Sequence, residues 1–266
     1  NSNILNQHIF YPISSGKLVC LVVKHRKIAQ EMKLLAFDTS SQALSVALTE
    51  DDNLLGKIDL NIKKNHSITL MPAIDFLMTN AGLQPEDLDR IAVAQGPGSY
   101  TGLRIAVTTA KTLASTLNID LVGVSSLAAI AANVEVAGKV VPLIDARRQN
   151  VYAGIYENGT SISQEHHVEL DKLMDTLKTE ERLYFTGELA NFRELISQTL
   201  PQAKFVENAE RRLPNAYQIA RLGAGYEPVN VDAFVPEYLK KVEAEEKWLE
   251  THAEDQGNDT HYIHKI

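Results

Sequence analysis

The sequence predicts an α/β protein made of two related lobes, and three observations support this fold class. First, a chain of 266 residues with 44% hydrophobic residues can bury a substantial core as one or two domains. Second, strand-like and helix-like patterns alternate along most of the chain. Third, an apolar strand that ends in aspartate and turns back into a second strand occurs twice, as "LLAFDTSSQALSVAL" and "VPLIDARRQNVYAGI". We therefore expect one such hairpin at the start of each lobe.

The first lobe is expected over residues 32–137, and its first half predicts three strands and a helix. Short apolar or alternating segments at 33–40, 42–50 and 53–62 are separated by tight turns and indicate an antiparallel meander. Helical spacing of apolar residues over 66–81 follows, and Gly82 is a typical helix stop.

The second half of this lobe predicts a parallel crossover. A strand at 89–95 leads into the glycine-rich stretch "AQGPGSYTGLRIAV", residues 94–107, and then into a helix from Gly102 to Leu117. A further strand is expected at 120–125. The order strand, helix, strand indicates parallel neighbours in one sheet.

The second lobe is expected over residues 138–240, with the boundary between lobes near 135–139. The segment 139–159 predicts two strands joined by a turn. A helix near 170–178, a strand at 183–187 and helices near 189–199 and 214–223 complete this lobe.

Both ends of the chain differ from this pattern. Residues 1–31 show neither sustained alternation nor helical spacing, and we interpret them as a leader or an upstream extension, either non-native or native. Residues 241–266 are rich in charge and lack an apolar face, which predicts a solvated, disordered tail.

Composition excludes several classes of protein. No apolar run is long enough to span a bilayer, so no membrane association is expected. The single cysteine, Cys20, cannot form an internal disulfide, and the sequence shows no Cys/His pattern with metal spacing, which favours a cytoplasmic protein without a metal of its own. A formal net charge of −8 argues against direct binding of nucleic acid.

The glycine-rich stretch matches neither of the two common phosphate-binding templates. A P-loop requires lysine after its second glycine, and a dinucleotide fingerprint requires glycines at the first, third and sixth places, whereas here they stand at 96, 98 and 102. A helix N-terminus capped by Ser99 or Thr101 could bind an anion weakly. We favour a tight turn that lets the helix pack closely on the sheet.

Asp38 and Asp145 are the other candidates for chemistry. Carboxylates at the tips of two opposed hairpins could hold a metal–nucleotide complex. Aspartate at a strand end is more often a turn former, so we favour the structural interpretation for both.

Two predicted helices lack the polar face expected of a surface helix. The segment from Gly102 to Leu117 contains only Arg104 and Lys111 as charged residues, and the helix over 66–81 contains only Asp75. Either another part of the same chain or a second subunit must cover them, and the pattern alone leaves both possibilities open.

Five segments carry a resemblance to a known family. The segments "LLAFDTSSQALSVAL", "GPGSYTGLRIAV", "GVSSLAAIA", "LIDARRQNVYAGIY" and "VPEYLKK" occur in the order found in the TsaB (YeaZ) family of the bacterial tRNA threonylcarbamoyladenosine system. The resemblance covers residues 32 to about 242. It implies the two-lobed actin, sugar kinase and Hsp70-like (ribonuclease H-like) fold, in agreement with the two aspartate-tipped lobes.

The resemblance also implies a noncatalytic paralogue of the catalytic subunit TsaD. Where TsaD-like proteins carry two metal-binding histidines four residues apart, this chain places Ser126 and Ile130, which cannot act as imidazole ligands. The superfamily's phosphate loops carry glycine after Asp-x, and neither hairpin tip does. The expected remnants of those loops are Asp38, Thr39, Gly96, Gly98, Ser99 and Asp145.

The resemblance further implies the partners. TsaB pairs with TsaD, TsaE joins them, and ATP and a metal ion are used by the partner subunits, while tRNA is met only through the complex. The family's dimer surface uses the two helices of the first lobe, which also explain a homodimer when the partner is absent. Residues expected at this surface are His66, Leu70, Ile74, Leu77, Ile105, Thr109 and Thr112.

Two other function classes are less well supported. An ATP-dependent kinase of the same superfamily would need intact phosphate loops. A peptidase would need a nucleophile with its base, or a metal site.

Overall fold

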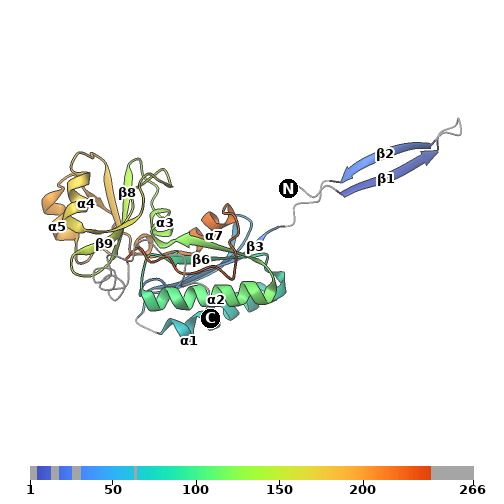
Figure 1. Cartoon of the computed structure of the whole chain (residues 1–266), viewed down its shortest axis with the longest axis horizontal. Coiled ribbons are helices and arrows are strands. Elements are labelled where there is room, and N and C mark those ends of the chain that lie inside the picture. Colours follow the sequence, from blue (N-terminus) through green and yellow to red (C-terminus); the bar gives the residue numbers. More distant parts are fainter. Residues whose placement is uncertain (1–4, 13–17, 26–30, 63–64, 241–266) are drawn as a thin grey trace, which may run out of the picture.

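The computed structural model describes residues 5–12, 18–25, 31–62 and 65–240. The predicted tail, 241–266, lies outside these residues. Within 1–31, the described parts are strands β1 (Leu5–Pro12) and β2 (Leu18–His25), which pair antiparallel in a hairpin that projects from the body (Figure 1). The hairpin was not apparent from the residue pattern, and the interpretation of this segment as a leader stays a prediction.

The first lobe is built on a five-stranded sheet with the order β5-β4-β3-β6-β7. Strands β3 (Lys33–Asp38), β4 (Leu44–Glu50) and β5 (Asn53–Leu60) form the predicted antiparallel meander. Strands β6 (Arg90–Gly96) and β7 (Asp120–Ser125) continue the sheet parallel to β3. Buried apolar residues fill β3 and β6 on both faces, as expected for central strands.

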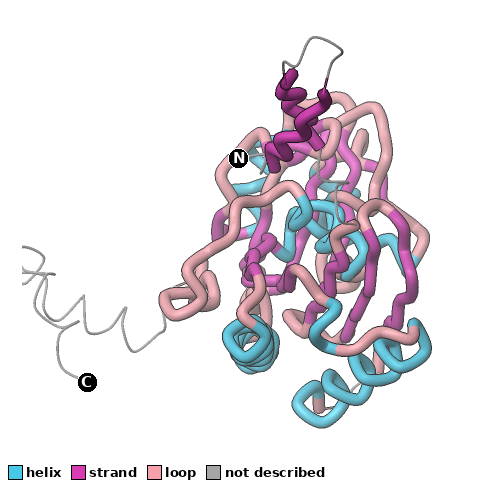
Figure 2. The backbone as a smooth tube through the Cα atoms, turned by 90° about the vertical axis from the view of Figure 1, so that its right-hand side faces the viewer, coloured by secondary structure: helices cyan, strands magenta, loops and turns pink. Residues whose placement is uncertain are grey.

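Helices cover both faces of this sheet. Helix α1 (His66–Ala81) and helix α2 (Tyr100–Leu117) lie on one face, and α3 (Ser126–Ala131) and α7 (Ala216–Ala224) lie toward the other (Figure 1). In the turned view of Figure 2, two helices again run below the strands of this lobe. The predicted ends of α1 are confirmed, because the Asn65 side chain accepts a hydrogen bond from the Ser67 N–H and Gly82 adopts φ 69°.

The second lobe repeats the strand order of the first. Strand β8 (Lys139–Asp145) pairs antiparallel with β9 (Asn150–Ala153) and β10 (Tyr156–Glu157), and parallel with β13 (Leu183–Gly187). The remaining elements, which complete the sheet and cover it, are η1 (Pro85–Asp87) in the first lobe and β11 (Thr160–Ser161), β12 (His166–Glu169), α4 (Leu170–Leu177), α5 (Arg193–Thr199), β14 (Lys204–Phe205) and α6 (Ala209–Arg212) in the second. The two lobes therefore share one topology, and the predicted α/β fold of two related lobes is confirmed.

The second lobe ends earlier than the predicted residue 240. Helix α7 packs on the first sheet, and Gly223 lies so close to it that an added Cβ would stand 2.8 Å from the Ala92 Cβ. Phe234, further along the chain, is buried in the core under α1 and α2. The hydrophobic residues of α7 complete the first lobe's core, so the chain returns to that lobe after α6.

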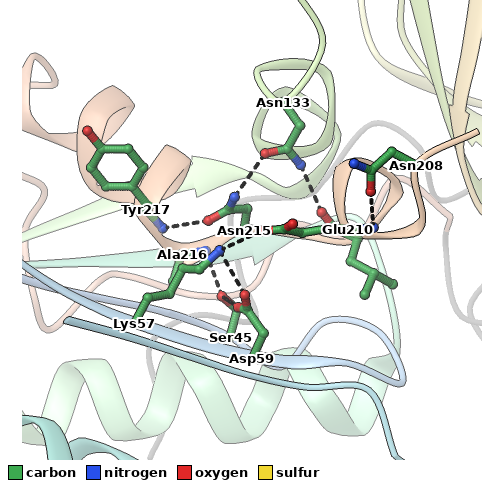
Figure 3. Close-up of polar contacts among 10 residues, drawn as sticks. Ser45, Lys57, Asp59, Asn133, Asn208, Glu210, Asn215, Ala216 and Tyr217 are labelled. Carbon is green, nitrogen blue, oxygen red and sulfur yellow. Dashed lines mark hydrogen bonds and ion pairs between the residues drawn. The ribbon is translucent and has the colours of Figure 1, made fainter. Parts of the chain in front are cut away.

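A polar network fixes the point at which the chain returns (Figure 3). The Ala216 N–H donates to Ser45 Oγ of β4 at 2.8 Å, and Asn215 caps α7 by accepting from the Tyr217 N–H at 3.0 Å. Asn215 also donates to Asn133, which follows α3, at 3.1 Å. Lys57 of β5 contacts Asp59 at 2.8 Å and Glu210 of α6 at 3.5 Å. The first bonds tie α7 to the first lobe, and the Lys57–Glu210 ion pair joins that lobe to α6 of the second.

Candidate functional site

The glycine-rich loop between β6 and α2 is closed by the chain's own backbone. An added Cβ at Gly98 would stand 2.4 Å from the carbonyl oxygen of Ser40, and one at Gly102 would stand 2.0 Å from that of Thr39. Hydrogen bonds seal this contact, because the Ser99 N–H donates to the Ser40 carbonyl at 2.6 Å and Thr39 Oγ1 donates to the Gly102 carbonyl at 2.7 Å. The glycines thus allow two loops of one chain to touch, as a tight turn requires.

The start of this loop also lies close to another backbone segment, and its end forms the cap of α2. Gly96 has φ 133°, and an added Cβ would lie 2.3 Å from the carbonyl oxygen of Glu237. Ser99 is the N-cap of α2, with its Oγ accepting from the Gly102 N–H at 3.3 Å, as one of the two predicted caps. Helix α2 therefore begins two residues before the predicted start at Gly102.

Asp38 and Asp145 make the same turn in the two lobes. Asp38 Oδ1 accepts from the Ser40 N–H at 2.5 Å, and Asp145 Oδ1 accepts from the Arg147 N–H at 2.7 Å. In both cases a carboxylate holds the backbone two residues further on, which is the turn-forming role favoured above. Asn191 donates to the other oxygen of Asp145 at 2.9 Å.

Asp38 differs from Asp145 in its burial. It is fully buried, and its Oδ2 has no hydrogen-bond partner among the described residues. Burial raises the pKa of Asp38 to about 6, partly offset by hydrogen bonds from Ser40. The carboxyl group faces protein rather than a solvent-filled site.

A cleft of about 790 Å³ separates the two hairpin tips. Its walls carry charges of both signs, among them His66, Asp145, Arg147, Glu188 and Lys240. His66 Nε2 lies 2.9 Å from the Ser41 carbonyl oxygen, so this residue stands at the cleft rather than on the outer face of α1. Within the described residues, no group of three or more His, Cys, Asp or Glu side chains could hold a metal ion.

Ser126 and Ile130, which the resemblance places where TsaD-like proteins carry metal-binding histidines, lie in a packed core. Ser126 is fully buried and Ile130 is 1% exposed, with Ile130 in a cluster that includes Val140 and Ile144 of β8. Beside them, Glu165 accepts hydrogen bonds from Ser125 Oγ at 2.6 Å and from the Tyr156 hydroxyl. Burial raises the pKa of Glu165. The protein's own side chains thus fill this region.

The outer face of α1 and α2 requires a correction of the predicted interface residues. Leu70, Ile74 and Leu77 are 1%, 5% and 7% exposed and belong to the core of the first lobe. These three side chains point toward the sheet and pack in one cluster with residues of its strands. Ile105 and Thr109 are half-buried and Thr112 is exposed. As a set, the predicted interface stays untested.

Three large apolar side chains face outward on α1, beside the exposed polar residues Ser67, Asp75, Thr79 and Asn80. Ile68, Met71 and Phe76 are 68%, 46% and 59% exposed. On α2 the outward positions carry mainly hydroxyl side chains, such as Thr108 and Thr112. We call this surface, with Ile68, Met71, Pro72, Phe76, Thr108 and Thr112 as its members, the α1–α2 face.

Charge is sparse on and around the α1–α2 face. Of the two charged residues of α2, Lys111 forms hydrogen bonds within the chain. Its Nζ donates to the carbonyls of Asp232 and Phe234 at 2.8 and 2.9 Å. Arg104 is exposed at one edge, and Asp75 is exposed on α1. The helix pattern could not predict that Lys111 binds the C-terminal segment, because Asp232 and Phe234 lie more than a hundred residues after it in the sequence.

Comparisons with known proteins agree on one family. The family model for TsaD, tRNA N6-adenosine threonylcarbamoyltransferase, matches residues 53–248. The tRNA threonylcarbamoyladenosine biosynthesis protein TsaB of Bacillus subtilis is 39% identical over 227 residues, which cover 83% of this chain and 99% of that protein. TsaB of Escherichia coli is 34% identical over 134 residues, covering 48% of this chain and 58% of that protein.

Solved structures lead to the same group. The structure titled YeaZ from Pseudomonas aeruginosa has a TM-score of 0.63 and 28% identity, covering 78% of this chain and all of that one. A second structure, described as an uncharacterized protein with similarity to peptidase YeaZ from Pseudomonas aeruginosa, has a TM-score of 0.66 and 28% identity, covering 79% of this chain and all of that one. Among the described residues, no helix is both long enough and apolar enough to cross a membrane.

Proposed function

This chain belongs to the TsaB (YeaZ) family of tRNA threonylcarbamoyladenosine biosynthesis proteins, and on that premise we propose that it is a noncatalytic subunit that binds a TsaD-type protein through the α1–α2 face. The observation that carries the proposal is the pairing of an exposed apolar helix face with glycine loops closed by the chain's own backbone.

The noncatalytic role is supported by the residues found at the glycine-rich loop and at positions 126 and 130. Backbone carbonyls of Thr39 and Ser40 fill the space beside Gly98 and Gly102 that a phosphate group would need. Ser126 and Ile130 offer no imidazole ligand and are buried. These features argue against the kinase alternative and against a metal-dependent peptidase.

The partner role is supported by the chemistry of the α1–α2 face. Three large apolar side chains that project from one helix are an unusual surface for a monomer, and they typically mark an interface. The hydroxyl side chains of α2 are small, which permits helices of a partner to approach closely. A partner with the same fold would present its own two helices to this face.

In this proposal the partners supply the chemistry. A TsaD-type protein holds the metal ion and transfers the threonylcarbamoyl group, a TsaE-type protein joins with its nucleotide, and ATP is used by the partner subunits. The tRNA contacts the assembled complex, in the cytoplasm, and the same face forms a homodimer when the partner is absent. The net charge of −8 agrees with RNA contact through other subunits.

The test is reconstitution of tRNA modification from purified components. TsaD-type and TsaE-type proteins, tRNA, ATP and a threonylcarbamoyl donor are incubated with this chain, without it, and with the variant Phe76→Glu. We expect modified adenosine only with the wild-type chain. Equal modification without the chain would refute the proposal, whereas modification by the chain without the TsaD-type protein would refute its noncatalytic part.

A further inference from the structure

Two tyrosines and an arginine form a compact cluster at the start of α2. The rings of Tyr100 and Tyr238 are stacked with centroids 5.1 Å apart and an interplanar angle of 29°. The Arg104 guanidinium carbon lies 4.3 Å from the centroid of the Tyr100 ring, and its Nε donates to the Tyr238 hydroxyl at 3.3 Å. We call these three residues the Tyr–Arg cluster.

The cluster is held in place by the C-terminal segment, residues 229–238. The Val229 N–H donates to the Leu121 carbonyl at 2.9 Å, which ties the segment to the edge strand β7. Phe234 inserts into the core, being 6% exposed. The Glu237 N–H donates to the Gln95 carbonyl at 2.7 Å, and the Gln95 side chain donates to the Glu237 carboxylate at 2.8 Å. Tyr238 follows directly, so its position is fixed.

Despite this support, the cluster remains open to solvent. Tyr100 is 47% and Tyr238 is 38% exposed. Arg104 has no ion-pair partner within the part of the chain that the structure describes. An exposed guanidinium stacked on tyrosine contributes little to stability in water, but its side-chain conformation is already fixed for binding.

The location of Arg104 connects the cluster with the α1–α2 face. Arg104 is one helical turn after Tyr100 and one turn before Thr108, a member of that face. Arginine and tyrosine are the residue types that most often carry binding energy in protein interfaces. A guanidinium held in one orientation also suits bidentate hydrogen bonding to a carboxylate.

We propose that Arg104, positioned by Tyr100 and Tyr238, is the polar anchor of the α1–α2 face and binds a carboxylate of the TsaD-type partner. This inference rests on the proposed function and adds to it a charged contact at the edge of an apolar interface. The C-terminal segment thereby takes part in partner binding through Tyr238, although it lies outside both helices.

The test measures the dissociation constant for a purified TsaD-type protein by calorimetry, at two salt concentrations. Arg104→Ala should weaken binding at least tenfold, and Arg104→Lys should also weaken it because lysine cannot donate in the bidentate geometry. Tyr238→Phe keeps the stacked ring but removes the hydroxyl acceptor, so a smaller loss of a few-fold is expected. Lys172→Ala, an exposed cation on α4, serves as the control and should bind as the wild type does.

The salt series separates a charged contact from a general structural effect. Binding of the wild type should weaken more with added salt than binding of Arg104→Ala, while the melting temperatures of the two proteins stay equal. If Arg104→Ala binds within twofold of the wild type with the same salt dependence, and Phe76→Glu still loses binding, the anchor is refuted and the proposed function stands. If the wild type itself does not bind, the proposed function fails and the anchor with it.

Discussion

At the scale of single residues, the role of the glycine-rich loop depends on which atoms lie where each glycine lacks a Cβ. Glycines at 96, 98 and 102 suggest a phosphate loop by composition, but each leaves room for a backbone carbonyl of the same chain. The comparison with the two phosphate templates favoured a tight turn, and weak binding of an anion at the helix N-terminus stays untested. The comparison could not predict which atoms fill the space, because Thr39 and Ser40 lie some sixty residues away from Gly102.

Replacement of Gly102 tests this account of the loop. Gly102→Ala places a Cβ 2.0 Å from the Thr39 carbonyl oxygen, so the two loops must separate, and we expect a loss of about 2 kcal/mol or more in the free energy of unfolding. Urea denaturation measures the change. Gly225→Ala is the control, because its Cβ would lie 3.8 Å from the nearest atom and should cost less than about 1 kcal/mol. Equal effects of the two variants would contradict the close contact.

Asp38 makes stability depend on pH. Its folded-state pKa of about 6 is above the ordinary value of 3.8 for aspartate, so the folded state favours the protonated carboxyl. The stability gained from this proton is complete below about pH 4 and is lost as the pH rises through 6. A shift of about two pH units corresponds to about 3 kcal/mol.

The variant Asp38→Asn isolates this contribution from those of other acids. The difference in free energy of unfolding between wild type and Asp38→Asn should change between pH 4 and pH 7, with the wild type losing stability relative to the variant as the pH rises. Denaturation at several pH values measures it. A difference that is constant over this range would show that Asp38 has an ordinary pKa.

At the scale of elements, helix α1 separates what the sequence can predict from what it cannot. Its bounds and its cap at Gly82 were predicted from the spacing of apolar residues and from the glycine that follows them. The same spacing did not show which arc faces the sheet and which faces outward, because both contain apolar residues. Burial now assigns Leu70, Ile74 and Leu77 to the core and leaves Phe76 outside.

Two substitutions on α1 test this assignment. Ile74→Glu places a carboxylate in the core and should cost at least about 3 kcal/mol of stability, whereas Phe76→Glu, at a position 59% exposed, should change stability by no more than about 0.5 kcal/mol. Thermal or urea unfolding of both variants gives the comparison. Comparable destabilisation by the two substitutions would mean that α1 is packed differently.

Longer strands could be predicted from their residue pattern, whereas very short strands could not. Strands β3, β4, β6 and β8 were predicted well, since each is a continuous apolar or alternating run. The short strands β10, β11 and β14 have two residues each and carry no periodicity. Helix α7 was expected, but its place on the first sheet depends on long-range packing of small residues such as Gly223.

At the scale of the whole molecule, the two lobes repeat one strand order around a shared cleft. The two lobes present equivalent aspartate turns across one cleft, at Asp38 and Asp145. In this chain both carboxylates hold their own backbone, and the cleft walls carry charges of both signs. The exposed apolar side chains Ile68, Met71 and Phe76 lie on α1 and do not line this cleft.

The central claim is that the α1–α2 face binds a TsaD-type partner. The most direct measurement is the mass of an equimolar mixture of this chain and a TsaD-type protein by size-exclusion chromatography with light scattering, for wild type and for Phe76→Glu. We expect a complex of both chains with the wild type, and two separate species with Phe76→Glu, whose own unfolding transition is unchanged. A complex of the same mass with Phe76→Glu would contradict it.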